Sequence, residues 1–348
     1  MRIGFALPLI ALALWAEHRG FAGATNSVLR ERADLARAGG GDLSGLQYAY
    51  PPLPTLLAVL APGTLGVAIF TALCAGVAMQ LVTARLVRRE VPLLLLGMLV
   101  LGLIAVPALW FEATQNLSGF LALMFLVIAL DGFVRFVARN DTIGGFVAGL
   151  MLAAAFLCDP IALVYAVALA VAAPLLATSQ LRHQPGGVRA TLCVLLFPLV
   201  AVGTAWAFLE WRFTGGAFAT LRIEAEWFSF DDGVLQGLAD ATRSVSRVAL
   251  RSPVYLVIGA LLLRRRTAVG LAYAVPFLGL VLAAWTGFAL SDALEFALLN
   301  LIALYSVPRS LSRDERIALA AAAVLQFVLL LSWDPAGAEF HRWAQLLF

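Results

Sequence analysis

The sequence predicts an all-α polytopic membrane protein built as a single transmembrane domain over residues 1–348. Of the 348 residues, 62% are apolar and 13% are charged, against about 25% charged in an ordinary soluble domain. Apolar runs long enough to cross a bilayer recur along the whole chain. The loops between these runs alternate between rich and poor in arginine, as the loops of a multi-pass protein do.

We expect about eleven transmembrane helices. They are predicted near residues 3–16, 64–84, 92–109, 117–133, 143–157, 161–177, 190–208, 252–263, 267–287, 293–308 and 317–333. The first of these is short and also resembles a signal peptide with a cleavage site after Ala24. We favour a retained first helix, because the segments that follow need an N-terminal anchor to orient them.

The distribution of arginine predicts the topology. The loops on one side, together with Arg2, carry 14 arginines and 5 acidic residues, whereas the other side carries 10 arginines and 16 acidic residues. Because positive charge is retained in the cytoplasm, the N-terminus is expected inside and the C-terminus outside. The expected location is the inner (cytoplasmic) membrane of a bacterium. Two extracytoplasmic loops, 17–63 and 209–251, are long enough to carry a site.

The first of these loops begins with a predicted surface helix. The stretch "TNSVLRERADLARAGGGDL" opens with Thr25 and Asn26, which suit a helix N-cap, and it ends in glycines. Val28, Leu29, Leu35 and Ala38 fall near one face and charged residues lie on the other, which is typical of a helix at the membrane surface.

A tyrosine-proline corner follows in "QYAYPPLPTLLAVLAPG". Tyr48 and Tyr50 suit the headgroup level, where amphipathic rings are favoured. Pro51 and Pro52 fix φ and predict an extended approach to the membrane. A short helix over 54–60 then precedes the break at Pro62-Gly63. We expect the corner to brace the first loop, although a simple proline-terminated helix start explains it equally well.

The second loop carries a row of arginines. Arg243, Arg247 and Arg251 are spaced four apart and therefore share one helical stripe, and Arg212 lies earlier in the loop. Arginine holds phosphate groups through paired N–H donors. The stripe is expected to bind either a donor phosphate or anionic lipid headgroups. The C-terminal tail places Phe340, Trp343 and Leu347 on one face, which predicts an interfacial helix or, alternatively, a free tail.

The first loop, with its surface helix, Gly-Gly break and "YPPL", resembles the GT-C superfamily of membrane glycosyltransferases. The stretches "GGFVAGLMLAAAFLCDPIALVYAVAL" (144–169) and "EWRFTGGAF" (210–218) are also similar to segments of that family. The resemblance covers roughly residues 1–220. It implies inverting transfer of a sugar from a polyprenyl-phosphate donor to a cell-envelope acceptor at the outer face of the membrane.

Catalysis of this kind needs a carboxylate as base or as metal ligand. In the family an acidic residue precedes the Gly-Gly by about fourteen positions, and in this chain Thr25 and Asn26 stand there. The remaining candidates are Asp34, Glu17 and Glu112. Asp34 also fits an ordinary helix-face charge paired with arginine, and Glu17 fits a charge that flanks the first span. A second acid at Asp159 fits a cap for the next helix better.

The missing acid leaves a second interpretation open, namely a non-catalytic GT-C-like membrane subunit that serves as a scaffold for partners or lipids. The expected partners are a polyprenyl-phosphate lipid, membrane lipids and other membrane subunits. Scattered His and Cys residues predict no metal site of the zinc type. A divalent cation beside the donor phosphate is the one cofactor that the chemistry admits. The chain has no block of basic residues of the kind that binds nucleic acid, so nucleic acid is not expected as a partner. A transporter is disfavoured, because the charged residues lie almost only at the ends of the predicted spans.

Overall fold

The computed structural model describes residues 4–38, 51–176, 187–217, 234–333 and 338–347. All regular structure in these residues is helical, with no strand among them, so the all-α prediction is confirmed. The helices of the first half are α1 (Ala6–His18), α2 (Ala24–Ala38), α3 (Pro52–Leu60), α4 (Gly63–Arg88), α5 (Leu93–Ile104), α6 (Pro107–Gln115), α7 (Leu117–Arg139), α8 (Thr142–Phe156) and α9 (Ile161–Leu176). Those of the second half are α11 (Gly187–Thr214), α13 (Val234–Leu250), α14 (Pro253–Arg265), α15 (Thr267–Trp285), α16 (Asp292–Ser306), α17 (Arg313–Leu331) and α18 (Ala338–Leu347).

Several of these helices are suited to a membrane. In the described part of the chain, α4, α7, α11 and α15 contain segments long and apolar enough to cross a bilayer, and two bent helix pairs raise the number to as many as six. Helices α1, α8 and α9 are apolar but shorter. The helices therefore indicate a membrane-embedded protein. Each of the eleven predicted segments overlaps a helix, while the number of spans stays a prediction.

Helix α16 forms the centre of the molecule. Every residue from Ala293 to Leu304 is buried, and α16 contacts α4, α7, α13 and α14. Buried apolar surface does not by itself favour association inside a bilayer, so close packing and internal hydrogen bonds hold such a helix. The amide of Asn300 fits this description, because it donates to Ser252 Oγ and to the carbonyl of Phe296, both at 2.9 Å.

The predicted span 92–109 is wrong as a single helix. Helix α5 ends at Ile104, α6 begins at Pro107, and the two axes differ by 69°. Proline has no N–H to continue the ladder and is favoured in the first turn of a new helix. The indole of Trp110 donates to the carbonyl of Ile104 at 2.6 Å, which satisfies one of the acceptors freed by the break.

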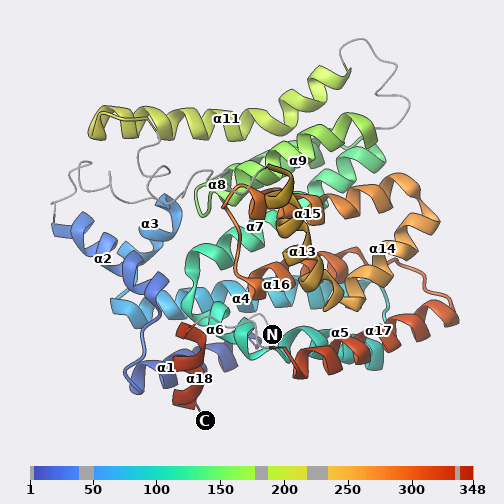
Figure 1. The fold of residues 1–348 in the computed structure, drawn as a ribbon, viewed down its shortest axis with the longest axis horizontal. Helices are drawn as coiled ribbons and strands as arrows, with labels where there is room; N and C mark the ends of the chain where they lie inside the picture. The colour runs from blue at the N-terminus through green and yellow to red at the C-terminus, as the bar shows by residue number, and fades with distance from the viewer. Residues whose placement is uncertain (1–3, 39–50, 177–186, 218–233, 334–337, 348) are drawn as a thin grey trace.

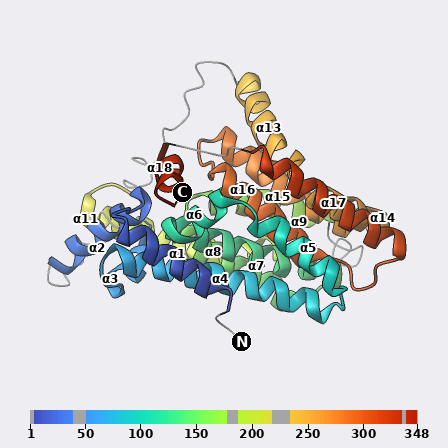
Figure 2. The same ribbon diagram turned by 90° about the horizontal axis from the view of Figure 1, so that it is seen from below.

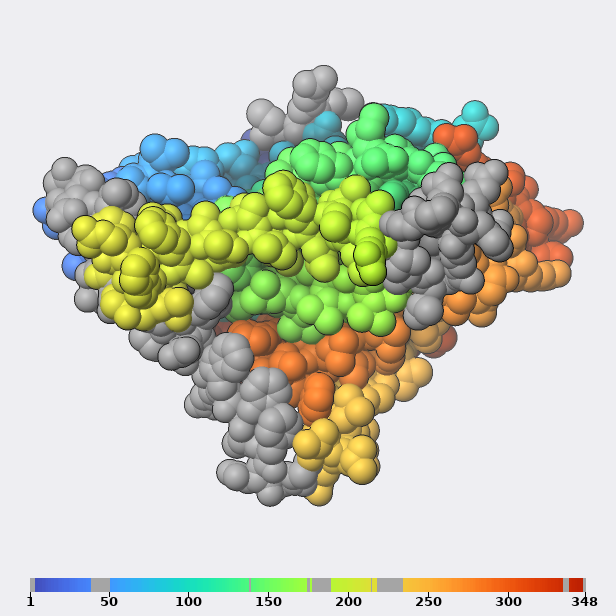
Figure 3. Space-filling view, turned by 90° about the horizontal axis from the view of Figure 1, so that it is seen from above, coloured from blue at the N-terminus to red at the C-terminus, as the bar shows by residue number. Residues whose placement is uncertain are grey.

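Small residues set the closest helix contacts. A Cβ added to Gly76 of α4 would lie 2.6 to 2.8 Å from atoms of Ala6 in α1. A Cβ at Gly149 of α8 would lie 2.5 Å from the carbonyl oxygen of Leu195 in α11. Such close approach of backbones is typical of helix pairs in membranes. Figure 3 shows α11 as a band along the surface above α8 and α9.

The molecule has two distinct ends. Figure 1 places α2 and α3 at one end and α14 and α17 at the other, and Figure 2 shows the same separation after a quarter turn. Helix α13 meets α14 at 94° and projects from the body in Figure 2. We refer to the first region, made by α2, α3, α6 and α18, as the α2–α3 end.

Candidate functional site

The expected N-cap at Thr25 and Asn26 is wrong, because α2 already begins at Ala24. Thr25 is exposed, whereas Asn26 is buried with 1% of its surface accessible. Its amide donates to the carbonyl of Thr114, and its oxygen accepts from the N–H of Leu117, both at 3.1 Å. The residue that stands where the family has an acid therefore fastens α2 to the junction between α6 and α7.

Asp34 is part of a second fastening. It accepts from Arg30 at 2.5 and 3.0 Å and lies 3.6 Å from Arg37. Both arginines also donate to the carbonyl of Ala61, at 2.8 and 3.2 Å, and Arg37 donates to that of Val59. These carbonyls lie at the end of α3, where a helix leaves acceptors unsatisfied. Asp34 thus orients the two arginines that cap α3, and we name Arg30, Asp34 and Arg37 the α2–α3 clamp.

The other two predicted acids have separate surroundings. Glu17 is exposed at the end of α1, and the hydroxyl of Thr64 lies 3.4 Å from both carboxylate oxygens. Glu112 is buried in α6. It accepts from Ser291 at 2.6 Å and from Asn116 at 2.8 Å. Because Asn116 caps α7 and Ser291 caps α16, Glu112 ties together the starts of two helices.

The predicted arginine stripe lies on α13 and just beyond it. Arg243 is exposed and paired with Asp240 at 2.8 Å, Arg247 is exposed, and Arg251 lies over the ring of Trp333 at 5.4 Å. Arg212 is exposed on α11, and its guanidinium lies 6.0 Å from the ring of Phe213. Arg243 and Arg247 are thus exposed on α13 and Arg251 is half-buried just after it, and among the described residues these arginines do not share one of the hollows of the molecule.

The predicted bracing residues are only partly described. Tyr48 and Tyr50 lie outside the described residues. Pro51 is the extended residue before α3, as the proline pattern predicted, whereas Pro52 already belongs to the helix, which begins two residues before the predicted start at 54. Asp159 accepts from the N–H of Ile161 at 2.9 Å and so acts as the cap expected for α9.

The C-terminal segment is a packed helix. Trp343 of α18 is buried, and its ring lies 5.6 Å from that of Phe111 in α6. Phe340 and Phe21 also pack edge-on against Phe111, at 6.1 and 6.3 Å. Helix α18 therefore covers α6 at the α2–α3 end, in agreement with the predicted helix, and the free-tail alternative is wrong for residues 338–347.

A different region contains the most concentrated charge. It is a hollow of about 570 Å³, and of the described residues one acidic residue, Asp131, lies in its wall. Eight arginines from the same described segments line it: Arg85, Arg88, Arg89, Arg135, Arg139, Arg265, Arg266 and Arg309. We call this the arginine pocket. All eight belong to the set of 14 arginines that the sequence assigned to one side of the membrane.

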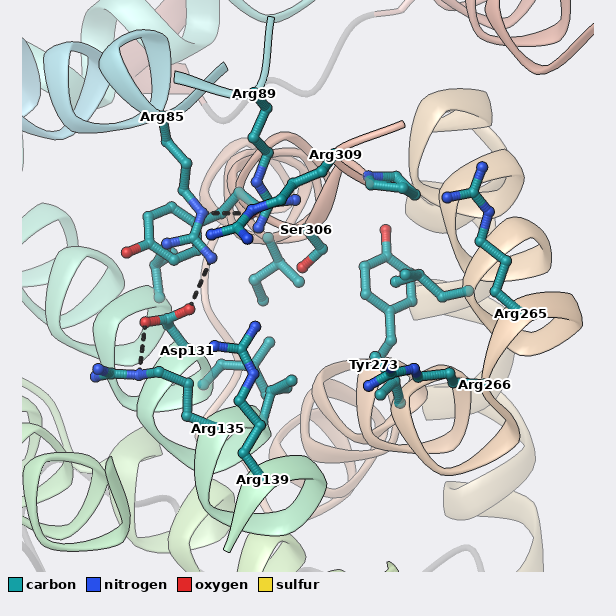
Figure 4. Close-up of a pocket in the computed structure, with 18 of the residues that line it drawn as sticks. Arg85, Arg89, Asp131, Arg135, Arg139, Arg265, Arg266, Tyr273, Ser306 and Arg309 are labelled. Atoms are coloured by element: carbon teal, nitrogen blue, oxygen red, sulfur yellow. Dashed lines mark hydrogen bonds and ion pairs between the residues drawn. The ribbon is translucent and has the colours of Figure 1, made fainter. Parts of the chain in front are cut away.

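The ends of several helices build the arginine pocket. The last turn of α4 and the residue after it contribute three arginines, and the C-terminal part of α7 contributes two together with Asp131. The corner between α14 and α15 contributes two more, and Arg309 follows α16. In Figure 4, Arg89 and Arg309 reach into the space from one side and Arg139 faces them from α7. Cations at helix C-termini are favoured by the helix dipole.

Three of the eight arginines are paired with carboxylates. Asp131 lies 3.0 Å from Arg85 and 3.2 Å from Arg135, and Asp141 lies 3.9 Å from Arg135. Arg265 is paired with Glu315 at 2.5 Å. The other five have no carboxylate at ion-pair distance in the part of the chain that the structure describes: Arg88, Arg89, Arg139, Arg266 and Arg309.

The pKa of Arg89 is lowered by its surroundings in the arginine pocket. Burial and the nearby Arg85 lower its pKa from the ordinary arginine value to about 10. The side chain is therefore still cationic at neutral pH, but its charge is held in an environment that disfavours it. Arg85 is held more firmly, because it lies 3.7 Å over the ring of Tyr305 and donates to the carbonyl of that residue at 2.9 Å.

Sequence reasoning did not identify this site. It treated these arginines only as markers of topology, because they belong to four separate loops and no short motif contains them. The sequence feature that could have predicted the site is the concentration of arginines in the last turns of helices. Helix ends on the same side of a membrane protein can lie next to one another in the fold. Guanidinium groups bind phosphate through two parallel N–H donors, so the arrangement is suited to a phosphate-bearing anion.

The chain was also compared with known proteins. No family model, no curated protein and no solved structure matches it. The functional conclusion therefore rests on the chain's own residues.

Proposed function

We propose that the protein is a membrane-embedded, non-catalytic scaffold that binds a phosphate-bearing ligand in the arginine pocket. The observation that carries the proposal is the set of five arginines that line one hollow without a described carboxylate partner. By the positive-inside rule this end of the molecule would face the cytoplasm.

Topology alone does not require such an arrangement. The positive-inside rule explains why arginines lie on one side, but it does not require them to face a shared hollow. Like charges raise each other's energy, and at an effective dielectric constant of about 20 a pair 4 Å apart costs about 4 kcal/mol. An anionic ligand would relieve this repulsion and stabilise the pocket.

The test is a binding measurement on the full chain purified in detergent, with inorganic pyrophosphate as the probe in calorimetric titrations. The double variant Arg89→Gln/Arg309→Gln is expected to bind at least tenfold more weakly than the wild type. Arg264→Gln is the matched control, because Arg264 is an exposed neighbour that does not line the pocket. Equal affinities of the double variant and the control would contradict the proposal.

Sugar transfer at the opposite end is the second candidate function. It is favoured by Glu112, a buried carboxylate oriented by two donors. Its helix α6 also lines an apolar hollow of about 250 Å³ shared with α1 and α4, which has the character of a lipid-chain site. We rank this function second because Glu112 accepts hydrogen bonds from Ser291 and Asn116, the residues that cap α16 and α7, and so already has a structural role.

A transfer assay separates the two functions. The wild type would be incubated with radiolabelled polyprenyl-phosphate sugars, and Glu112→Gln and Asp34→Asn would be compared with it. Transfer that is lost in Glu112→Gln, with the fold retained, would establish the enzyme and its base. Transfer that persists in Glu112→Gln would remove Glu112 as the base, and absence of transfer by the wild type would favour the scaffold.

A further inference from the structure

We infer that the ligand of the arginine pocket is a diphosphate ester that carries an apolar group, rather than a single phosphate. The inference rests on the proposed function, since it names the chemical class of the ligand for that same site. Three features of the pocket support this inference. They are the number of uncompensated charges, the division of the arginines into paired and unpaired ones, and the apolar part of the wall.

The charge count favours more than one phosphoryl group. Three arginines are matched by Asp131, Asp141 and Glu315, which leaves five positive charges without a described counterion. A phosphate monoester carries about −1.5 to −2 near neutral pH and would offset less than half of this. A second phosphoryl group adds at least one further negative charge and two non-bridging acceptor oxygens, so a diphosphate offsets half or more of the five positive charges.

The unpaired arginines also come from different directions. Arg88 and Arg89 come from the end of α4, Arg139 comes from α7, and Arg266 lies between α14 and α15. Figure 4 shows Arg89 and Arg309 on one side of the space and Arg139 and Arg266 on the other. Two linked phosphoryl groups can engage both sides at once, whereas a single phosphate has only a few oxygens to share among them.

Asp131 gives the pocket a fixed edge. It holds Arg85 and Arg135 from two helices with one carboxylate and is only 13% exposed. A side chain held by both an ion pair and a ring contact, as Arg85 is, is poorly placed to reorient toward a ligand. We therefore assign Asp131 a positioning role, and the diphosphate is expected to contact the five unpaired arginines instead.

Part of the wall of the pocket is apolar. It is formed by Val127, Leu130 and Val134 of α7, with Leu262, Val269 and Ile302 from three other helices. Water forms no hydrogen bonds with such a surface. An apolar group that covers it is stabilised by about 25 cal/mol for each Å² of apolar surface removed from water. The hollow of about 570 Å³ has room for a diphosphate and the first part of an attached chain.

The test compares four probes with the full chain in detergent by calorimetric titration: inorganic phosphate, inorganic pyrophosphate, dodecyl phosphate and dodecyl diphosphate. Dodecyl diphosphate is expected to bind at least tenfold more tightly than dodecyl phosphate and than pyrophosphate. In Arg89→Gln/Arg309→Gln this preference for the diphosphate is expected to fall at least fivefold, while Arg264→Gln retains it.

Each outcome has a separate meaning. Equal binding of dodecyl phosphate and dodecyl diphosphate would overturn the inference and leave the proposed function intact. Equal binding of pyrophosphate and dodecyl diphosphate would overturn the apolar part and identify a soluble diphosphate as the source, whereas the expected result identifies a lipid. Failure of all four probes to bind would overturn the proposed function itself.

Discussion

The polar groups of the α2–α3 end have hydrogen-bond partners within the protein, whereas most of the charged groups in the arginine pocket have no described carboxylate partner. At the α2–α3 end, Asn26, Asp34 and Glu112 each bond to partners that join two or more helices. In the arginine pocket, five arginines face a hollow without a described carboxylate. Polar groups that satisfy one another stabilise a fold, whereas like charges gathered without partners destabilise it unless a ligand neutralises them.

This difference teaches which polar residues to associate with function. The residues that resembled a catalytic set are the ones most firmly engaged in holding the structure. The residues that served only as a sign of topology are the ones left free to act. The predictions below test this contrast, from the largest expected effect to the smallest.

The largest effect is expected at the α2–α3 end. Asn26→Ala removes a side chain that satisfies a buried carbonyl and a buried N–H, and each group left unsatisfied costs about 1–3 kcal/mol. We expect a loss of about 2–4 kcal/mol in the free energy of unfolding, measured by denaturant or thermal unfolding in detergent. The exposed neighbour Thr25→Ala is the control and should change it little. An unchanged free energy of unfolding in Asn26→Ala would contradict the idea that hydrogen bonds between buried polar groups stabilise the α2–α3 end.

The next effect concerns the counterion inside the arginine pocket. Asp131→Asn leaves Arg85 and Arg135 without their shared carboxylate, and hydrogen bonds to charged groups are worth about 1.5–3 kcal/mol. We expect a loss in that range at low ionic strength, a smaller loss in high salt, and partial recovery when pyrophosphate is added. Asp240→Asn removes an exposed ion pair with Arg243 and should cost less than about 1 kcal/mol. If pyrophosphate does not restore any of the stability lost in Asp131→Asn, the expectation that the pocket binds an external anion is contradicted.

A third effect concerns the α2–α3 clamp. Asp34→Asn removes the charge that orients Arg30 and Arg37, but the two arginines keep their bonds to the carbonyls after α3. Since the Asp34 side chain is 53% exposed, we expect a loss of only about 0.5–1 kcal/mol. Double-mutant cycles with Arg30→Ala would measure the coupling. A coupling near zero would contradict the proposed role of Asp34 in fixing the clamp.

The smallest effect is a local pH dependence at the edge of the arginine pocket. A hydrogen bond from the backbone N–H of Ser312, together with Arg265, lowers the pKa of Glu315 below its ordinary value of 4.5. The stability that Glu315 contributes is therefore complete above its unfolded pKa and is lost as the pH falls through its lower folded pKa. Amide exchange in the first turn of α17 should rise in that acidic range in the wild type. In Glu315→Gln the exchange should already be faster at neutral pH and should lack this rise.

Most of the helical architecture was predictable, because long apolar runs and Gly or Pro breaks determine helices almost independently of context. The Asp159 cap followed from local chemistry, and the short helix after the proline corner was predicted with a start two residues late, at 54 instead of Pro52. The break before Pro107 was missed because the apolar run continues across it. The role of Asn26 could not be predicted, since its partners Thr114 and Leu117 are about ninety residues away in the chain. The arginine pocket was missed for the same reason, because it assembles helix ends that the sequence keeps apart.

The α2–α3 clamp constrains the order in which the protein assembles. Helix α3 has nine residues, about 14 Å of helix at 1.5 Å per residue, which is too short to cross a hydrocarbon core of about 30 Å. It cannot be threaded into the bilayer as a span of its own, and its final carbonyls would have no partners there. Arg30 and Arg37 provide those partners only after α2 has docked. During biogenesis, α3 should therefore settle only after α2 has docked on the junction between α6 and α7.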